Sequence, residues 1–179
     1  MKVCIFGASS ENISQVYKDT AFELGQRLAE EGHTLVFGGG RRGLMGAAAR
    51  GFKNKGGYVI GVAPKLFDTG TILLEECDEK VITEDMSSRK QLMVDISDAF
   101  IALAGGIGTF DELFQVMVEY QLGYHNKPVI VYNVNGFYDR LLDMLEHTAE
   151  EGFMREGNGE LYRVCTDSAE VVRCLKEKS

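Results

Sequence analysis

Apolar residues recur along the chain in two alternating patterns. Short apolar runs rich in Val, Ile and Phe are typical of buried strands, and longer segments with a helical period separate them. The runs predict strands at Lys2–Phe6, Thr34–Phe37, Tyr58–Val62, Lys80–Ile82, Ala99–Leu103 and Val129–Tyr132, with Tyr162–Cys165 as a candidate seventh. The other segments predict helices near Ile13–Glu31, Leu44–Lys55, Asp85–Ser97, Phe110–Leu122, Phe137–Glu150 and Ser168–Lys178. Regular alternation of strand and helix favours an α/β fold, in which a mostly parallel sheet carries helices on both faces.

The composition fits one globular domain over residues 1–179. The chain is 45% hydrophobic and 26% charged, so it can bury a sizeable core. Lys and Arg number 19 against 27 Asp and Glu, and a net charge of −8 would repel a polyanion. We therefore expect no nucleic-acid partner. Two basic pairs, Arg41-Arg42 and Arg89-Lys90, suit a small phosphorylated ligand better.

The cysteines and the apolar runs bear on the cellular compartment. Cys4, Cys77, Cys165 and Cys174 form no Cys-x-x-Cys pair and have no His at zinc-finger spacing, which predicts reduced, structural thiols and no metal site. No apolar run approaches the length that crosses a bilayer, and the first strand, broken by Gly7, is too short for a signal peptide. We expect a cytoplasmic protein with no membrane partner.

A glycine-rich turn at residues 104–112 carries the main chemical signal. It reads Ala-Gly-Gly-Ile-Gly-Thr-Phe-Asp-Glu and joins a predicted strand to a predicted helix. Glycines let a ligand approach the backbone, and the unpaired N–H groups and dipole of the helix start favour negative charge. Glu112 lies farther along the same helix. The turn therefore predicts a phosphate cradle made by Gly105, Gly106, Ile107, Gly108 and Thr109.

The same residues also fit a purely structural interpretation. Thr109 and Glu112 have the spacing of a capping box, in which Thr109 caps the helix and Glu112 bonds back to the backbone of the cap. However, three glycines in four positions exceed what a cap requires, and Arg89-Lys90 supplies cations from another helix whose start faces the same sheet edge. We favour the ligand site and keep the cap as its alternative.

A second glycine-rich turn, residues 38–43, matches G-x-G-x-x-G. That fingerprint belongs on the first strand-to-helix turn of a dinucleotide fold, and the first turn here is Gly7-Ala8-Ser9-Ser10. Ala63-Pro64 stands where the acidic ribose partner is expected, and no G-x-x-x-x-G-K-[ST] motif occurs. We therefore predict no NAD site, no bound cofactor and no P-loop phosphoryl transfer.

These motifs resemble those of the Lonely-guy family, nucleotide phosphoribohydrolases long labelled lysine decarboxylases and related to the DprA/Smf proteins. The family signature Pro-Gly-Gly-x-Gly-Thr-x-x-Glu resembles residues 104–112, and its companion Met-x-x-Arg-Lys resembles residues 86–90. Residues 4–10, 35–40, 43–46 and 121–129 also resemble family segments, so the resemblance covers nearly the whole chain. It implies a Rossmann-like three-layer sandwich and a homodimer whose site lies near the subunit interface.

The resemblance also implies an activity, namely hydrolysis of the N-glycosidic bond of AMP or N6-substituted AMP to free base and ribose 5-phosphate. Glu112 would offset positive charge on the sugar, and Arg89 would bind phosphate or order Glu112. The small-molecule nucleotide would further contact Ser9, Gly39, Gly40, Met86 and Lys90.

The chain departs from the family pattern at two places. Ala104 replaces the usual Pro, which removes no phosphate donor. Many plant-type members carry a substrate-contacting Glu directly after a Pro-Lys pair, whereas Pro64-Lys65 is followed by Leu66 and the irregular stretch Pro64–Asp78 is longer. The identity of the base therefore stays open.

Other functional classes remain as alternatives. A nucleotide sensor would use the same cradle without turnover, and a carrier of other phosphorylated ligands would ignore the base. Pyridoxal-dependent decarboxylation needs a Schiff-base lysine with a partner for the pyridine nitrogen, and no lysine is marked for this role. A partner subunit is favoured because the helix near Phe110–Leu122 carries the apolar residues Phe114, Met117, Val118 and Leu122.

Overall fold

Seven parallel strands form one sheet in the part of the chain that the structure, a computed structural model, describes: residues 1–67, 74–154 and 161–177. The strands are β1 (Lys2–Phe6), β2 (Thr34–Phe37), β3 (Tyr58–Pro64), β4 (Glu79–Thr83), β5 (Ala99–Ala102), β6 (Val129–Tyr132) and β7 (Arg163–Cys165). The helices are α1 (Gln15–Glu30), α2 (Gly43–Asn54), α3 (Met86–Ile96), α4 (Ile107–Gln121), α5 (Asp139–Glu150) and α6 (Ser168–Lys176), with short 3-10 turns η1 (Lys65–Phe67) and η2 (Val134–Gly136). The expected α/β architecture is confirmed.

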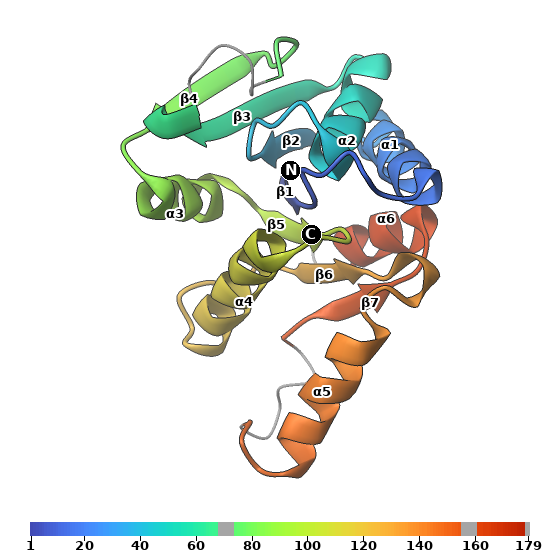
Figure 1. Cartoon of the computed structure of the whole chain (residues 1–179), viewed down its shortest axis with the longest axis vertical. Coiled ribbons are helices and arrows are strands. Elements are labelled where there is room, and N and C mark those ends of the chain that lie inside the picture. Colours follow the sequence, from blue (N-terminus) through green and yellow to red (C-terminus); the bar gives the residue numbers. More distant parts are fainter. Residues whose placement is uncertain (68–73, 155–160, 178–179) are drawn as a thin grey trace.

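The strand order β4-β3-β2-β1-β5-β6-β7 places a topological switch point between β1 and β5 (Figure 1). From β1 the chain builds the sheet outward through β2, β3 and β4, and it then returns to add β5 on the other side of β1. Ligands of open α/β sheets bind at such a point, beyond the carboxyl ends of the strands. The loops after β1 and β5 are therefore brought together at the edge where the sequence predicts its phosphate cradle.

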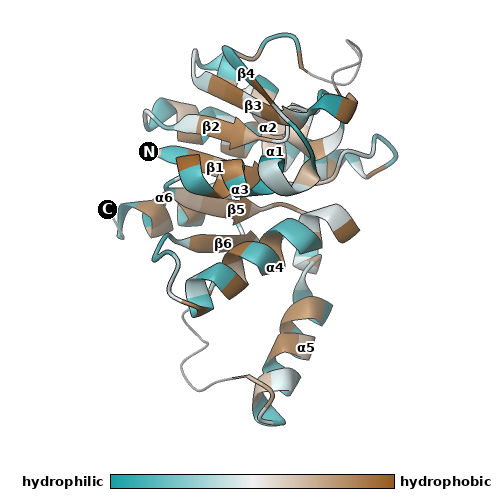
Figure 2. Cartoon of the chain, turned by 90° about the vertical axis from the view of Figure 1, so that its left-hand side faces the viewer, coloured by the Kyte–Doolittle hydropathy of each residue, from teal (hydrophilic) through white to brown (hydrophobic). Residues whose placement is uncertain are grey.

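Two apolar layers hold the helices to the sheet. Side chains alternate along a strand, so Val3 and Ile5 of β1 pack beneath α1, α2 and α6, whereas Cys4 and Phe6 pack beneath α3 and α4. Figure 2 shows the largely hydrophobic strands at the centre, with helices whose outward faces are more hydrophilic. Helix α5 differs because it projects beyond the sheet and has no buried residue (Figure 1).

Most predicted boundaries lie within two residues of those in the structure, but the start of helix α4 is an exception. It begins at Ile107, three residues before the predicted start, with Gly106 as its N-cap. Helix α5 begins at Asp139 because η2 comes first and holds Asn135 at φ 52°. Of the irregular stretch 64–78, residues 68–73 lie outside the described residues, as does the predicted helix end at Lys178. None of the helices described is both long and apolar enough to cross a bilayer.

Candidate active site

A cavity of about 390 Å³ lies at the carboxyl edge of the sheet, beside the switch point. Its walls come from the turns that follow β1, β2 and β5, from the first turn of α3, and from η1 after β3. Segments far apart in sequence thus supply one concave site. The lining residues are Gly7, Ala8, Ser9, Gly38, Gly40, Met45, Phe67, Met86, Arg89, Lys90, Gly106, Gly108, Thr109, Asp111 and Glu112.

A buried ion pair, Arg89 with Glu112, forms one wall of this cavity. The Arg89 Nη1 donates to Glu112 Oε1 at 2.9 Å, and its Nε donates to the Val62 carbonyl at 3.2 Å. Arg89 is 6% exposed and Glu112 is 8% exposed. A Cβ added at Gly38 would overlap the guanidinium, so the glycine leaves the space that Arg89 fills. Arg89 is held from three sides and can fix the orientation of the carboxylate.

The start of helix α3 explains how Arg89 reaches this position. Asp85 is the N-cap: its carboxylate accepts from the Ser88 N–H at 2.8 Å, and Ser88 Oγ accepts from the Asp85 N–H at 3.1 Å. This capping box fixes the first turn of the helix immediately before Arg89. The helix start is therefore fixed by exposed polar residues, while Arg89 enters the cavity.

Burial gives Glu112 an unusual protonation equilibrium. Loss of solvation raises the pKa of Glu112 above its ordinary value, and the Arg89 guanidinium opposes that shift. Arg89 favours the ionised form, because it is a permanent cation at hydrogen-bond distance. An ionised carboxylate in the cavity can stabilise positive charge that develops on a bound ligand.

The phosphate cradle predicted from the glycines is open. Gly106 has extended backbone, and no side chain in the described part of the chain caps the helix that it starts. A Cβ added at Gly106 or Gly108 would meet no atom within 4 Å, so both residues face free space. The first N–H groups of α4 thus remain available to an anion.

The capping-box interpretation of Thr109 and Glu112 is wrong. Thr109 is the third residue of helix α4 rather than its cap, and Glu112 bonds Arg89 on another helix. Thr109 packs instead against Gly105, where an added Cβ would overlap its Oγ1. With Gly106 as the N-cap, the helix begins closer to strand β5 than a Thr109 cap would place it.

The other predicted substrate residues divide into two groups. Ser9, Gly40, Met86 and Lys90 line the cavity, where Lys90 Nζ pairs with Asp111 at 2.8 Å. Three others are absent from its described lining: Gly39, Gly105 and Ile107. Gly39 accepts a backbone bond from Leu74, Gly105 lines a neighbouring apolar pocket, and the Ile107 side chain is 83% exposed.

Sequence reasoning missed six of the cavity residues, namely Gly7, Ala8, Gly38, Met45, Phe67 and Asp111. Asp111 occupies a variable position of the glycine motif, and its one signal is that it precedes Glu112 on the same helix. Phe67 lies in an irregular stretch with no periodic pattern. Arg41-Arg42, singled out by charge, instead lines a separate polar pocket with Arg50 and Glu11.

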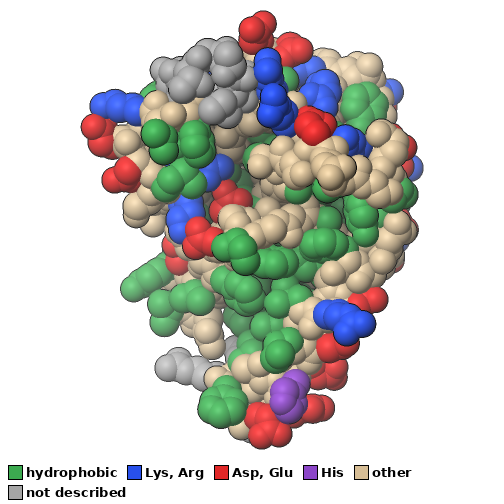
Figure 3. Space-filling model, in the orientation of Figure 1, with side chains coloured by type: hydrophobic (Ala, Val, Ile, Leu, Met, Phe, Trp, Pro, Cys, Tyr) green, Lys and Arg blue, Asp and Glu red, His purple; other side chains and the backbone are tan. Residues whose placement is uncertain are grey.

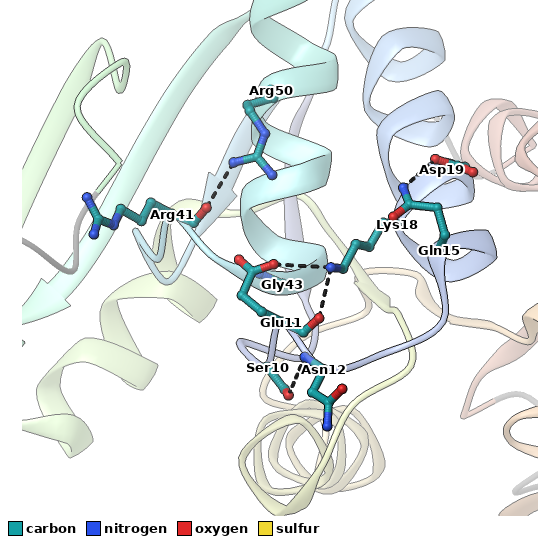
Figure 4. A network of polar contacts seen from close by, with 9 residues as sticks. All are labelled: Ser10, Glu11, Asn12, Gln15, Lys18, Asp19, Arg41, Gly43 and Arg50. Atoms are coloured by element: carbon teal, nitrogen blue, oxygen red, sulfur yellow. Dashed lines mark hydrogen bonds and ion pairs between the residues drawn. The ribbon is translucent and has the colours of Figure 1, made fainter.

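The second glycine turn has a structural role, which Figure 4 shows. Glu11 Oε1 accepts from the Gly43 N–H at 3.0 Å, and Lys18 Nζ holds the same carboxylate at 3.2 Å. This bond to Gly43 lowers the pKa of Glu11. A Cβ added at Gly43 would overlap the Ala8 carbonyl, and φ is +60° there. The start of helix α2 thus already holds a carboxylate, and the absence of a dinucleotide site there stays a prediction.

Residues 45–175 match the model of the family described as "Possible lysine decarboxylase". The chain belongs to this family. It is 41% identical over 178 residues to the "Probable cytokinin riboside 5'-monophosphate phosphoribohydrolase LOGL2" of Oryza sativa subsp. japonica, with 99% of this chain and 73% of the relative covered. It is 40% identical over 176 residues to the cytokinin riboside 5′-monophosphate phosphoribohydrolase LOG1 of Arabidopsis thaliana, with 98% and 83% covered. The resemblance seen in the motifs is confirmed.

Solved structures agree on the fold of the family. The molybdenum cofactor binding protein of Rippkaea orientalis superposes with a TM-score of 0.74 at 22% identity, covering 99% of this chain and 94% of that one. DNA processing protein A of Helicobacter pylori gives a TM-score of 0.61 at 19% identity, covering 99% and 81%. At such identities the likeness concerns the Rossmann-like architecture alone.

Proposed function

We propose that this chain hydrolyses the N-glycosidic bond of nucleoside 5′-monophosphates, AMP or N6-substituted AMP, to free base and ribose 5-phosphate. The observation that carries the proposal is the buried Arg89–Glu112 pair in a cavity that also opens onto the uncapped start of helix α4. Relatives about 40% identical are named cytokinin riboside 5′-monophosphate phosphoribohydrolases, which supports the same reaction.

The proposed geometry assigns each end of the substrate to one set of groups. The phosphate binds the backbone N–H groups around Gly106, Gly108 and Thr109, with Ser9 beside them. The sugar then extends along helix α4 toward Glu112. Since an anchored phosphate orients the sugar, binding energy remote from the scissile bond contributes to its cleavage.

The proposed chemistry places the Glu112 carboxylate against the sugar. When the C1′–N bond breaks, its electron pair leaves with the base and positive charge builds on the sugar, as in glycoside hydrolysis. The carboxylate stabilises this charge and orients the water whose oxygen bonds C1′, and the proton that this water loses balances the proton that the departing base gains. Arg89 is a positioning residue, because its contacts to Glu112 and the Val62 carbonyl fix the carboxylate before substrate arrives.

Incubation with a panel of nucleoside 5′-monophosphates and the matching nucleosides tests this reaction. Chromatography should reveal free base from the monophosphates and little from the nucleosides, because only the phosphate engages the cradle. Equal turnover of AMP and adenosine contradicts the proposed cradle. Tight binding of AMP without any released base would favour the sensor alternative.

We further propose a homodimer with the site beside its interface. Phe114, Val118 and Leu122 form an exposed apolar strip on α4, and Met144 is exposed on α5. Figure 3 shows hydrophobic side chains gathered on this face, over the region of α4 and α5. Such a strip suits a second copy of the chain, and α4 also carries the cradle. A cytoplasmic location stays a prediction.

A further inference from the structure

The candidate active site also has apolar side chains in its lining, which belong neither to the cradle nor to the ion pair. They are Met45, Phe67 and Met86, and they come from α2, η1 and α3. Phe67 is the one aromatic side chain among the described residues of the lining. The cavity thus offers open backbone for a phosphate, charge for a sugar, and apolar surface for whatever the sugar carries.

Core packing does not account for the position of Phe67. Among the described residues, neither apolar core layer includes Phe67 or Met86. No other described aromatic ring contacts Phe67 either. The ring is nevertheless half-buried and faces the cavity, whereas the preceding Leu66 is 74% exposed and does not line it. An aromatic ring that lines the cavity and has no aromatic or core partner among the described residues can stack on a ligand.

The charged groups of the cavity are already paired with one another. Among the described residues of the lining, Arg89 holds Glu112 and Lys90 holds Asp111. These pairs leave no free charged side chain to read the hydrogen-bonding edge of a base. A base against Met45, Phe67 and Met86 would meet a phenyl ring and two thioethers, which make apolar contacts with its face.

Resting on the proposed hydrolase function, we propose that Phe67 stacks on the base and makes the site selective for purines as a class. Every base has a π-face, and the two fused rings of a purine offer more of it than a pyrimidine does. Apolar side chains beside the base also accept a substituent on its exocyclic nitrogen, since the substituent would displace no charged hydrogen-bond partner. AMP, N6-substituted AMP and IMP should then be cleaved with kcat/KM values within about ten-fold of one another, and CMP more slowly.

Binding measurements isolate the contribution of the ring. In a Glu112→Gln background, which should slow turnover by about 10²–10³, AMP and ribose 5-phosphate are titrated calorimetrically into protein with Phe67 intact or replaced. Phe67→Ala should weaken AMP binding by about 5- to 150-fold, the factor equivalent to loss of one base–aromatic stack. Ribose 5-phosphate has no base, so its affinity should stay unchanged. Phe67→Tyr should restore AMP binding, and the adjacent control Leu66→Ala should alter neither ligand.

The outcomes separate this proposal from the proposed hydrolysis. Unchanged AMP affinity in Phe67→Ala overturns the stacking role, as does an equal loss for AMP and ribose 5-phosphate, which would indicate a general defect. A wild-type preference above about 100-fold for one purine overturns the class selectivity. If no base is released from any monophosphate while AMP binding still depends on Phe67, stacking stands and the hydrolase proposal fails.

Discussion

Glu112→Gln tests the proposed chemistry with the smallest change in shape. The amide oxygen of Gln can still accept the hydrogen bond that Arg89 Nη1 now donates to Glu112 at 2.9 Å. The negative charge is lost, so the 6% exposed Arg89 becomes a buried cation without a counter-charge. The substitution therefore separates the charge of residue 112 from its size and its hydrogen bond.

Two magnitudes follow for this variant. Removing one partner of a buried ion pair costs about 3–5 kcal/mol, and the retained hydrogen bond to a charged group returns about 1.5–3 kcal/mol, leaving a destabilisation of about 1–3 kcal/mol. For a chain of this size that lowers the Tm by roughly 2–12 °C. Turnover should fall by about 10²–10³, the effect of removing one preorganised electrostatic group.

A thermal melt and chromatographic release of base from AMP measure the two effects. Glu119→Gln is the matched control: it makes the same change on the same helix, where the Glu119 side chain accepts a hydrogen bond from Gln115 Nε2 at 2.8 Å and is not among the cavity residues described. It should keep both Tm and turnover. A folded Glu112→Gln protein that cleaves AMP within about three-fold of the wild-type rate would refute the electrostatic role of Glu112.

Three further predictions follow from the site and its surroundings. Gly38→Ala should reduce turnover at least about ten-fold, because the new Cβ displaces the Arg89 guanidinium; unchanged steady-state kinetics would contradict this. Because burial raises the pKa of Glu112, kcat/KM should fall as pH drops through that raised pKa, and its acid limb should lie above the ordinary Glu value of about 4.3. The same group binds more protons in the folded state, so its contribution to stability decreases as pH rises from the ordinary to the raised pKa, which melts across this range can measure. Val118→Glu should convert a dimer into a species near the 19.8 kDa chain mass in light scattering, and a wild-type protein already at that mass would contradict the proposed assembly.

The sequence predicted those parts of the fold and site that depend on local pattern. Buried strands and amphipathic helices have strong periodicities, so their order and the parallel sheet were predicted correctly. Glycines at 106 and 108 marked an open helix start, and the expectation that Arg89 orders Glu112 agrees with the bond between them. Their roles in catalysis remain predictions.

Features that depend on contacts between distant segments were missed or misplaced. The helix start at Ile107 was placed late because Thr109 and Glu112 match a capping sequence, and nothing local reveals that Glu112 bonds another helix. Phe67 follows a strand in a short 3-10 turn, and a single aromatic residue there has no periodic neighbours that could predict its direction.

The carboxylate of Glu11 at the start of helix α2 has a consequence for the kind of anion that the protein can accept. Two glycine-rich turns at this sheet edge end in helix starts, and each could attract an anion. At α2 the chain supplies its own anion, tethered at high effective concentration and held by the Gly43 N–H and Lys18. A second phosphate would have to displace that internal competitor and would meet its negative charge. If α4 binds the phosphate as proposed, we expect a ligand with one phosphate to bind more tightly than one that needs a second phosphate site at α2.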